Sequence, residues 1–134
     1  HQSLLYPVVD IDKGLDDYPP NSLGMLLTGA SMVYFRDHYL PRAADRADWR
    51  ASPLKAGSLA GSPPALVITC GHDPLAAEGR AYAERLEREG VTVASLHLSD
   101  QTHGVLTMSK AIGPALALQD FVAAALRDVF ARRG

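Results

Sequence analysis

The sequence predicts an α/β fold in which parallel strands form an open sheet and helices flank it. Residues 65–70 (ALVITC) form an apolar run that is typical of a strand buried on both faces. Apolar residues then recur at helical spacing, and a second β-rich run follows at residues 91–98. Because a short connection through a helix makes consecutive strands parallel, these three observations predict a strand–helix–strand unit.

The elements of this unit have separate local signals. The helix after residue 70 has one apolar face, and Gly90 is expected to end it as a C-cap. That face consists of Leu75, Gly79, Tyr82, Ala83 and Leu86. A polar turn that contains His103 follows the second strand, and a last helix is expected to begin at Gly113 and Pro114. Residues 65–134 are therefore predicted to form a βαβα unit.

The N-terminal half has weaker patterns. Residues 3–6 are predicted to form a strand that Pro7 ends, and residues 10–20 a loop. One amphipathic helix is expected from Asn21 or Ser22, either of which is a good N-cap, to Pro41. Its helically spaced residues are Leu23, Leu26, Leu27, Ala30, Tyr34 and Leu40. Residues 42–64 carry three prolines and are expected to be mostly loop.

Composition narrows the possible functions. The 134 residues are 47% hydrophobic, which suits one domain or a piece of one. A formal charge of −2, with no basic stripe, argues against a nucleic-acid partner. No apolar run approaches the ~20 residues of a membrane span and no signal peptide is recognisable, so a cytoplasmic location is expected. The single cysteine, Cys70, lies in an apolar run, so neither an internal disulfide nor a metal site is predicted. No cofactor is expected.

Asp73 and His103 each follow a predicted strand. Asp73 lies three residues after Cys70, His103 lies five after Leu98, and the two are 30 positions apart (103 minus 73). Reactive side chains of open parallel sheets gather beyond the carboxyl ends of the strands, so both are expected on one rim. Local alternatives are an N-cap role for Asp73 before Pro74 and an exposed loop position for His103. Their order matches the last two members of a Ser, Asp, His triad.

The chain resembles a known family along nearly its whole length, most densely from Ser52 to Gly104. Asp73-Pro74-Leu75, Glu78-Gly79, Tyr82-Ala83 and Leu86, followed by His103-Gly104, are similar to motifs in the C-terminal part of the hormone-sensitive-lipase-like (family IV) α/β-hydrolases, which are esterases and lipases. The resemblance implies a serine carboxylesterase with Asp73 as the triad acid and His103 as the base. It also implies a small or medium acyl ester as substrate. Val105 stands where the family usually has phenylalanine.

The resemblance also implies that residues 13–50 contribute to a cap over the active site. Seven apolar side chains of this segment could line an acyl pocket or simply pack a helix on the sheet, so no substrate-binding residue is assigned. They are Leu23, Met25, Leu26, Leu27, Met32, Tyr34 and Phe35.

Other ionisable residues compete less well for the catalytic roles. Asp100 lies three residues before His103, but it is expected in the same turn with no helix to hold it. His97 alternates with leucines as a strand residue does, and His72 adjoins the acid but would point elsewhere. His38 lies near the end of the predicted cap helix.

The serine of the expected triad has no motif in these residues. The nucleophile elbow, G-x-S-x-G, does not occur; residues 29–33 (GASMV), with Ser31, come nearest but lack the second glycine. No H-G-G motif offers oxyanion-hole amides either. In the family both elements precede a strand that ends in Tyr-Pro, which resembles residues 3–7 of this sequence, so this chain alone is expected to be inactive. The alternative is a half-hydrolase that serves as a binding module, with a second copy or a complementary N-terminal half as partner.

Overall fold

The computed structural model describes residues 1–131, with the side chains at positions 21 and 23 left out. The chain divides into two compact units, one ending at His103 and the other beginning at Gly104.

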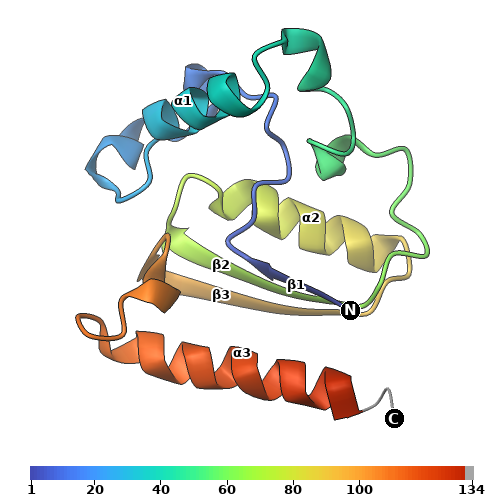
Figure 1. Cartoon of the computed structure of the whole chain (residues 1–134), viewed down its shortest axis with the longest axis vertical. Helices are drawn as coiled ribbons and strands as arrows, with labels where there is room; N and C mark the ends of the chain where they lie inside the picture. Colours follow the sequence, from blue (N-terminus) through green and yellow to red (C-terminus); the bar gives the residue numbers. More distant parts are fainter. Residues whose placement is uncertain (132–134) are drawn as a thin grey trace. The chain divides into compact units, whose positions relative to one another are not determined.

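Three parallel strands, labelled in Figure 1, form the sheet of the first unit. The strand β2 pairs with both others, which gives the order β1-β2-β3. They are β1 (Gln2–Leu5), β2 (Ala65–His72) and β3 (Val93–Thr102). The central strand, β2, is buried from Ala65 to Cys70, as its continuous apolar run predicts. The parallel pairing confirms the α/β prediction and directs the carboxyl ends of all three strands to one edge of the sheet.

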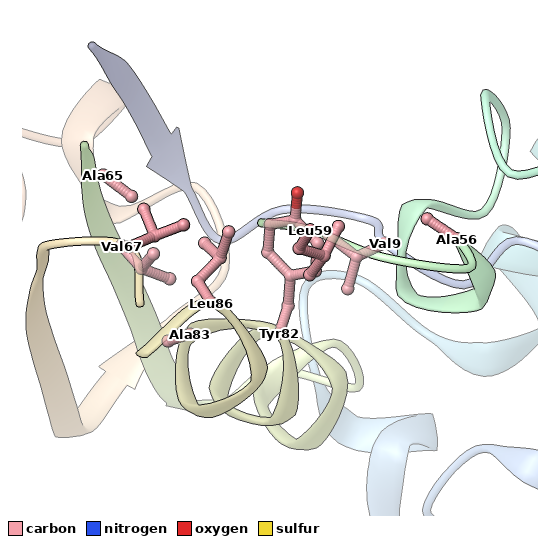
Figure 2. Packing of buried hydrophobic residues seen from close by; sticks show 9 residues of the cluster. Val9, Ala56, Leu59, Ala65, Val67, Tyr82, Ala83 and Leu86 are labelled. Atoms are coloured by element: carbon pink, nitrogen blue, oxygen red, sulfur yellow. The ribbon is translucent and has the colours of Figure 1, made fainter. Parts of the chain in front are cut away.

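Helix α2 (Ala76–Arg88) covers one face of this sheet. Its residues Tyr82, Ala83 and Leu86 share one buried hydrophobic cluster with Ala65 and Val67 of β2 (Figure 2). A Cβ at Gly79 would lie 2.8 Å from the methyl carbon of Thr69, so the missing side chain lets helix and strand approach closely. Burial of each large apolar side chain in such a layer contributes about 1.5–3 kcal/mol. Gly90, at φ +83°, follows the end of the helix as predicted.

The N-terminal helix is shorter than predicted. Helix α1 runs from Gly29 to Tyr39, and its N-cap is Thr28, whose hydroxyl accepts a hydrogen bond from Ser31 N at 3.1 Å. Residues Pro20–Gly24 form a separate 3-10 helix, so the prediction of one helix from Asn21 or Ser22 to Pro41 is wrong. The side chain of Asn21 lies outside the described residues. The helix starts late because Thr28, with an extended backbone, serves as its N-cap. A Cβ at Gly29 would lie 2.8 Å from Tyr18 Cβ, so the missing side chain lets the first turn approach Tyr18 closely.

Strand β3 is longer than predicted. The pairs Cys70–Leu98 and His72–Thr102 bracket an irregularity, with one residue on β2 opposite three on β3. A Cβ at Gly71 would lie 2.0 Å from Ser99 O, so only glycine fits on the β2 side. Asp100, expected in a turn, therefore lies within β3 and is exposed. A side-chain pattern alone does not reveal such a bulge, because it depends on the neighbouring strand.

Glu78 of α2 holds the segment that follows β1. Its Oε1 accepts hydrogen bonds from Val9 N (2.9 Å) and Asp10 N (3.2 Å), and its Oε2 pairs with Lys13 Nζ at 2.6 Å. The Glu78 side chain is only 1% exposed. A buried carboxylate requires such partners, and here each partner belongs to residues 9–13. The segment is therefore fixed to the helix rather than free to move over it.

The second unit contains a 3-10 helix (Val105–Thr107) and helix α3 (Gly113–Ala131). The predicted start of this last helix at Gly113 is confirmed. Gln119 donates a side-chain hydrogen bond to Leu106 O, which ties the two helices of the unit together. Within residues 1–131, no helix is both long and apolar enough to cross a bilayer.

Candidate active site

Asp73 and His103 form a hydrogen-bonded pair beyond the ends of β2 and β3. His103 Nδ1 lies 2.8 Å from Asp73 Oδ2. The Asp73 side chain is 1% exposed, whereas that of His103 is 25% exposed. The two residues that the sequence placed on one rim are thus in direct contact, with the carboxylate shielded from water and the imidazole open to it.

The start of α2 holds the other oxygen of Asp73. Asp73 Oδ1 accepts a hydrogen bond from Leu75 N at 2.9 Å, and the Asp73 carbonyl accepts one from Ala76 N at 3.1 Å. Because α2 begins at Ala76, Asp73 stands in the turn before the helix and is not its N-cap, and Pro74 is not the first helical residue. The carboxylate nevertheless satisfies one of the amides at this end, as aspartate does in an Asx turn.

Tyr6 packs against the imidazole of His103. The two ring centroids are 4.6 Å apart and the planes are tilted by 57°. Tyr6 has φ +39°, and among residues 1–131 it is the one non-glycine residue with positive φ. Such a backbone costs on the order of 1–3 kcal/mol and persists only where its surroundings impose it. Sequence reasoning assigned Tyr6 only to the end of a strand; the proline that follows was the available signal of an unusual turn.

A cavity of about 320 Å³ opens beside His103 and is lined almost wholly by apolar side chains. Its other lining residues are Leu75, Val8 and Ile11, together with Leu27, Met32, Phe35 and Tyr39. Three of the seven predicted lining candidates, Leu27, Met32 and Phe35, are among them.

The remaining candidates lie elsewhere. Met25 lines a separate hollow of about 460 Å³ with a mixed polar and apolar lining, which includes Asp73, Lys13 and Arg80. Leu26 and Tyr34 are 63% and 59% exposed, and the Leu23 side chain is outside the described residues. Val8, Ile11, Tyr39 and Leu75 were missed because they come from different segments that only the fold brings together.

The pair has a defined acid–base polarity. A carboxylate only accepts hydrogen bonds, so His103 Nδ1 carries the proton and Nε2 is the basic nitrogen. The nearby thiol is a poor alternative nucleophile, because burial and then the charge of Asp73 raise the pKa of Cys70 to about 11. No group of three or more potential metal ligands occurs in the part of the chain that the structure describes.

The competing residues have other partners or lie apart. His97 Nδ1 is hydrogen-bonded to Thr69 Oγ1 at 2.9 Å on β3, and His72 is exposed at the end of β2. Ser31 lies in the first turn of α1, with its Oγ 2.9 Å from the hydroxyl of Thr28. It therefore does not stand at a strand-to-helix turn, the setting of a nucleophile elbow.

Comparison with known proteins identifies the family. A sequence profile described as alpha/beta hydrolase fold matches residues 1–107. The chain is 37% identical over 132 residues to the carboxylic ester hydrolase LipN of Mycobacterium tuberculosis, covering 98% of this chain and 35% of LipN. It is 34% identical over 114 residues to the ethyl acetate hydrolase of Pseudomonas putida, covering 85% of this chain and 36% of that enzyme.

Solved structures agree with these relatives. A serine-to-alanine mutant of LAE6, an α/β hydrolase enzyme from the metagenome of Lake Arreo, superposes with a TM-score of 0.84 at 34% identity, covering 97% of this chain and 41% of that one. EstE1, a thermostable carboxylesterase from a metagenomic library, gives 0.83 at 30% identity, with 95% and 44% coverage. The chain thus spans less than half the length of each of these relatives. It belongs to the α/β-hydrolase fold family, and its relatives are the hormone-sensitive-lipase-like esterases that its motifs indicated.

Proposed function

We propose that Asp73 and His103 are the acid and base of a serine carboxylesterase whose nucleophile lies outside these 134 residues. The hydrogen bond between His103 Nδ1 and the buried Asp73 carboxylate carries this proposal. The ester-hydrolase relatives supply the reaction class. The absence of G-x-S-x-G from the sequence supports the location of the serine.

The reaction follows from the polarity of the pair. His103 Nε2 takes the proton of the serine hydroxyl as its oxygen attacks the ester carbonyl, and then gives that proton to the departing alcohol. The acyl-enzyme is then hydrolysed by water in the same way. Nε2 takes a proton from the water as the water oxygen attacks the acyl carbon, and the proton passes to the serine oxygen as the carboxylic acid leaves. Asp73 orients the ring throughout and stabilises the imidazolium.

The apolar cavity beside His103 is the proposed acyl site. At about 320 Å³ it lies at the small end of the range for ligand pockets, which suits a small or medium acyl group. Leu27, Met32 and Phe35 bring residues 13–50 to its wall, in agreement with a cap role for this segment. Oxyanion-hole amides are expected to come from outside these residues, as is the serine.

The test compares the complete gene product with a polypeptide of these 134 residues, using 4-nitrophenyl butyrate. The complete protein is expected to turn over the ester and the 134-residue polypeptide to be inactive. Asp73→Asn in the complete protein is expected to lower kcat by about 10³- to 10⁴-fold, because the imidazole loses the partner that fixes its tautomer. Asp100→Asn is the matched control, since Asp100 is an exposed carboxylate on β3, and it should leave kcat unchanged.

Two results would contradict the proposal. Turnover by the 134-residue polypeptide that disappears on Ser31→Ala would locate the nucleophile in α1. An active complete protein that is indifferent to Asp73→Asn would remove the pair from the mechanism and favour a binding role for this part of the chain.

A further inference from the structure

We infer that Tyr6 is a positioning residue that holds the imidazole plane of His103, and that the strained backbone at Tyr6 serves this purpose. The inference rests on the proposed role of His103. It concerns a residue that contacts His103 but does not itself line the cavity.

The hydrogen bond to Asp73 is not sufficient to fix the ring. It restrains one atom, Nδ1, but the ring can still tilt about that contact, and a quarter of the His103 side chain faces solvent. The Tyr6 ring, 4.6 Å away and tilted by 57°, blocks such tilting from its side. General-base catalysis needs Nε2 directed at the serine hydroxyl, so the orientation of the plane matters as much as the tautomer.

The backbone around Tyr6 imposes its conformation. Tyr6 N donates to Ile68 O at 2.6 Å, which keeps it attached to β2 although β1 ends at Leu5. Pro7 then lies against α2, with its Cδ 3.6 Å from the position that a Cβ would take at Gly79. Held at both ends, Tyr6 adopts φ +39°, which an L-residue avoids unless its surroundings require it.

Glu78 provides a further attachment of this segment to α2. It binds the amides of Val9 and Asp10 and thereby keeps the chain after Pro7 on the helix. Tyr6 follows β1, but its backbone is hydrogen-bonded to β2 and the chain after it is held on α2, the same two elements between which Asp73 stands. Tyr6 and Asp73 therefore share one rigid support, and the ring that contacts His103 cannot shift independently of the carboxylate that binds it.

The test uses the complete protein with ¹⁵N-labelled histidine. The ring nitrogen shifts of His103 report which nitrogen carries the proton, and a dominant Nδ1–H form is expected in the wild type and in Tyr6→Phe. Tyr6→Ala frees the ring to tilt away from Asp73 and should therefore increase the Nε2–H form. It should also lower kcat by about 10- to 100-fold, the size expected for a misplaced reacting group, while KM stays within about twofold. Tyr6→Phe keeps the ring and should restore both readouts.

Two further variants separate positioning from folding. Tyr6→Gly removes the ring but tolerates positive φ, so it should reproduce the loss of kcat even if Tyr6→Ala folds poorly. Tyr34→Ala removes the ring that packs on His38 and should change the signals of His38 alone.

The inference is overturned if Tyr6→Gly keeps both the wild-type tautomer and wild-type kcat, or if Tyr6→Phe loses as much as Tyr6→Gly, which would assign the effect to the hydroxyl. Failure of the proposed function is distinct: Asp73→Asn would then leave kcat unchanged, whereas the nitrogen shifts would still report the effect of Tyr6 on His103.

Discussion

Two histidines of this chain have nearly the same immediate neighbours. His103 packs against Tyr6 with ring centroids 4.6 Å apart, and His38 packs against Tyr34 at 4.1 Å. In each case Nδ1 has an oxygen partner at 2.8 Å. The partner is the Asp73 carboxylate for His103 and the Tyr34 carbonyl, one helical turn earlier, for His38. A tyrosine ring packed on the imidazole and an oxygen partner for Nδ1 therefore do not by themselves make a histidine a candidate base.

The difference lies in the charge and the origin of the partner. A buried carboxylate stabilises an imidazolium much more than a carbonyl does, because the two opposite charges interact with little solvent between them. Asp73 is 30 positions from His103 and comes from another strand, whereas Tyr34 and His38 are neighbours on α1. The local pair forms in any helix with this spacing; the distant pair requires the sheet.

The largest predicted effect separates the two histidines directly. His103→Asn should lower kcat of the complete protein by about 10³- to 10⁴-fold, or about 4–5.5 kcal/mol of transition-state stabilisation, because the base is lost. The same substitution at His38, which lies in neither cavity beside Asp73 or His103, should leave kcat unchanged. Steady-state ester hydrolysis measures both variants. Equal losses of kcat would mean that His103 and His38 do not differ in role.

The next effect concerns the anchor of the Tyr6 segment. Glu78→Ala should lower the free energy of unfolding by about 2–4 kcal/mol, because it leaves the amides of Val9 and Asp10 and the ammonium of Lys13 without their buried partner. Urea denaturation measures this, and the exposed Glu87 on the same helix provides the control through Glu87→Ala. A similar small loss for both variants would mean that the hydrogen bonds and ion pair of Glu78 contribute nothing to stability.

Backbone strain predicts that the difference in stability between the glycine and alanine variants has opposite signs at Tyr6 and Tyr34. Tyr6→Gly should be about 1 kcal/mol more stable than Tyr6→Ala, because glycine accepts φ +39° without strain. At Tyr34, inside α1, glycine should instead be about 1 kcal/mol less stable than alanine. Denaturant midpoints of the four variants measure these differences in stability. If glycine were less stable than alanine at both positions, the result would count against strain at Tyr6.

The smallest expected effect completes the comparison. His38→Ala should change the free energy of unfolding by no more than about 0.5 kcal/mol, as is usual for an exposed side chain on a helix. Thermal or urea unfolding measures it. A loss above about 1 kcal/mol would show that the ring contact and hydrogen bond of His38 stabilise α1 more than its exposure suggests.

Periodicity and chain order were sufficient for the elements whose residues form their own pattern. The buried run of β2, the apolar face of α2 and the start of α3 were predicted because each depends on neighbours in the sequence. The contact of Asp73 with His103 agrees with the rule that strand ends of a parallel sheet meet on one edge.

Features that depend on distant partners could not be predicted. The hydrogen bond from Val9 to Glu78 joins residues 69 positions apart, and it brings Val8 and Ile11 to the cavity. The close approaches of Gly29 to Tyr18 and of Gly71 to Ser99 likewise depend on residues from other segments. No local pattern in the sequence encodes these close approaches.

The bulge opposite Gly71 has a consequence for how this site tolerates change. A strand advances about 3.3 Å per residue, which is more than the tolerance of a hydrogen bond, so His103 meets Asp73 only if three residues separate Leu98 from Thr102. Ser99 and Asp100 are both exposed. At these positions the number of residues is constrained while their side chains are not, so the chain accepts substitutions where a single deletion would separate the base from its acid.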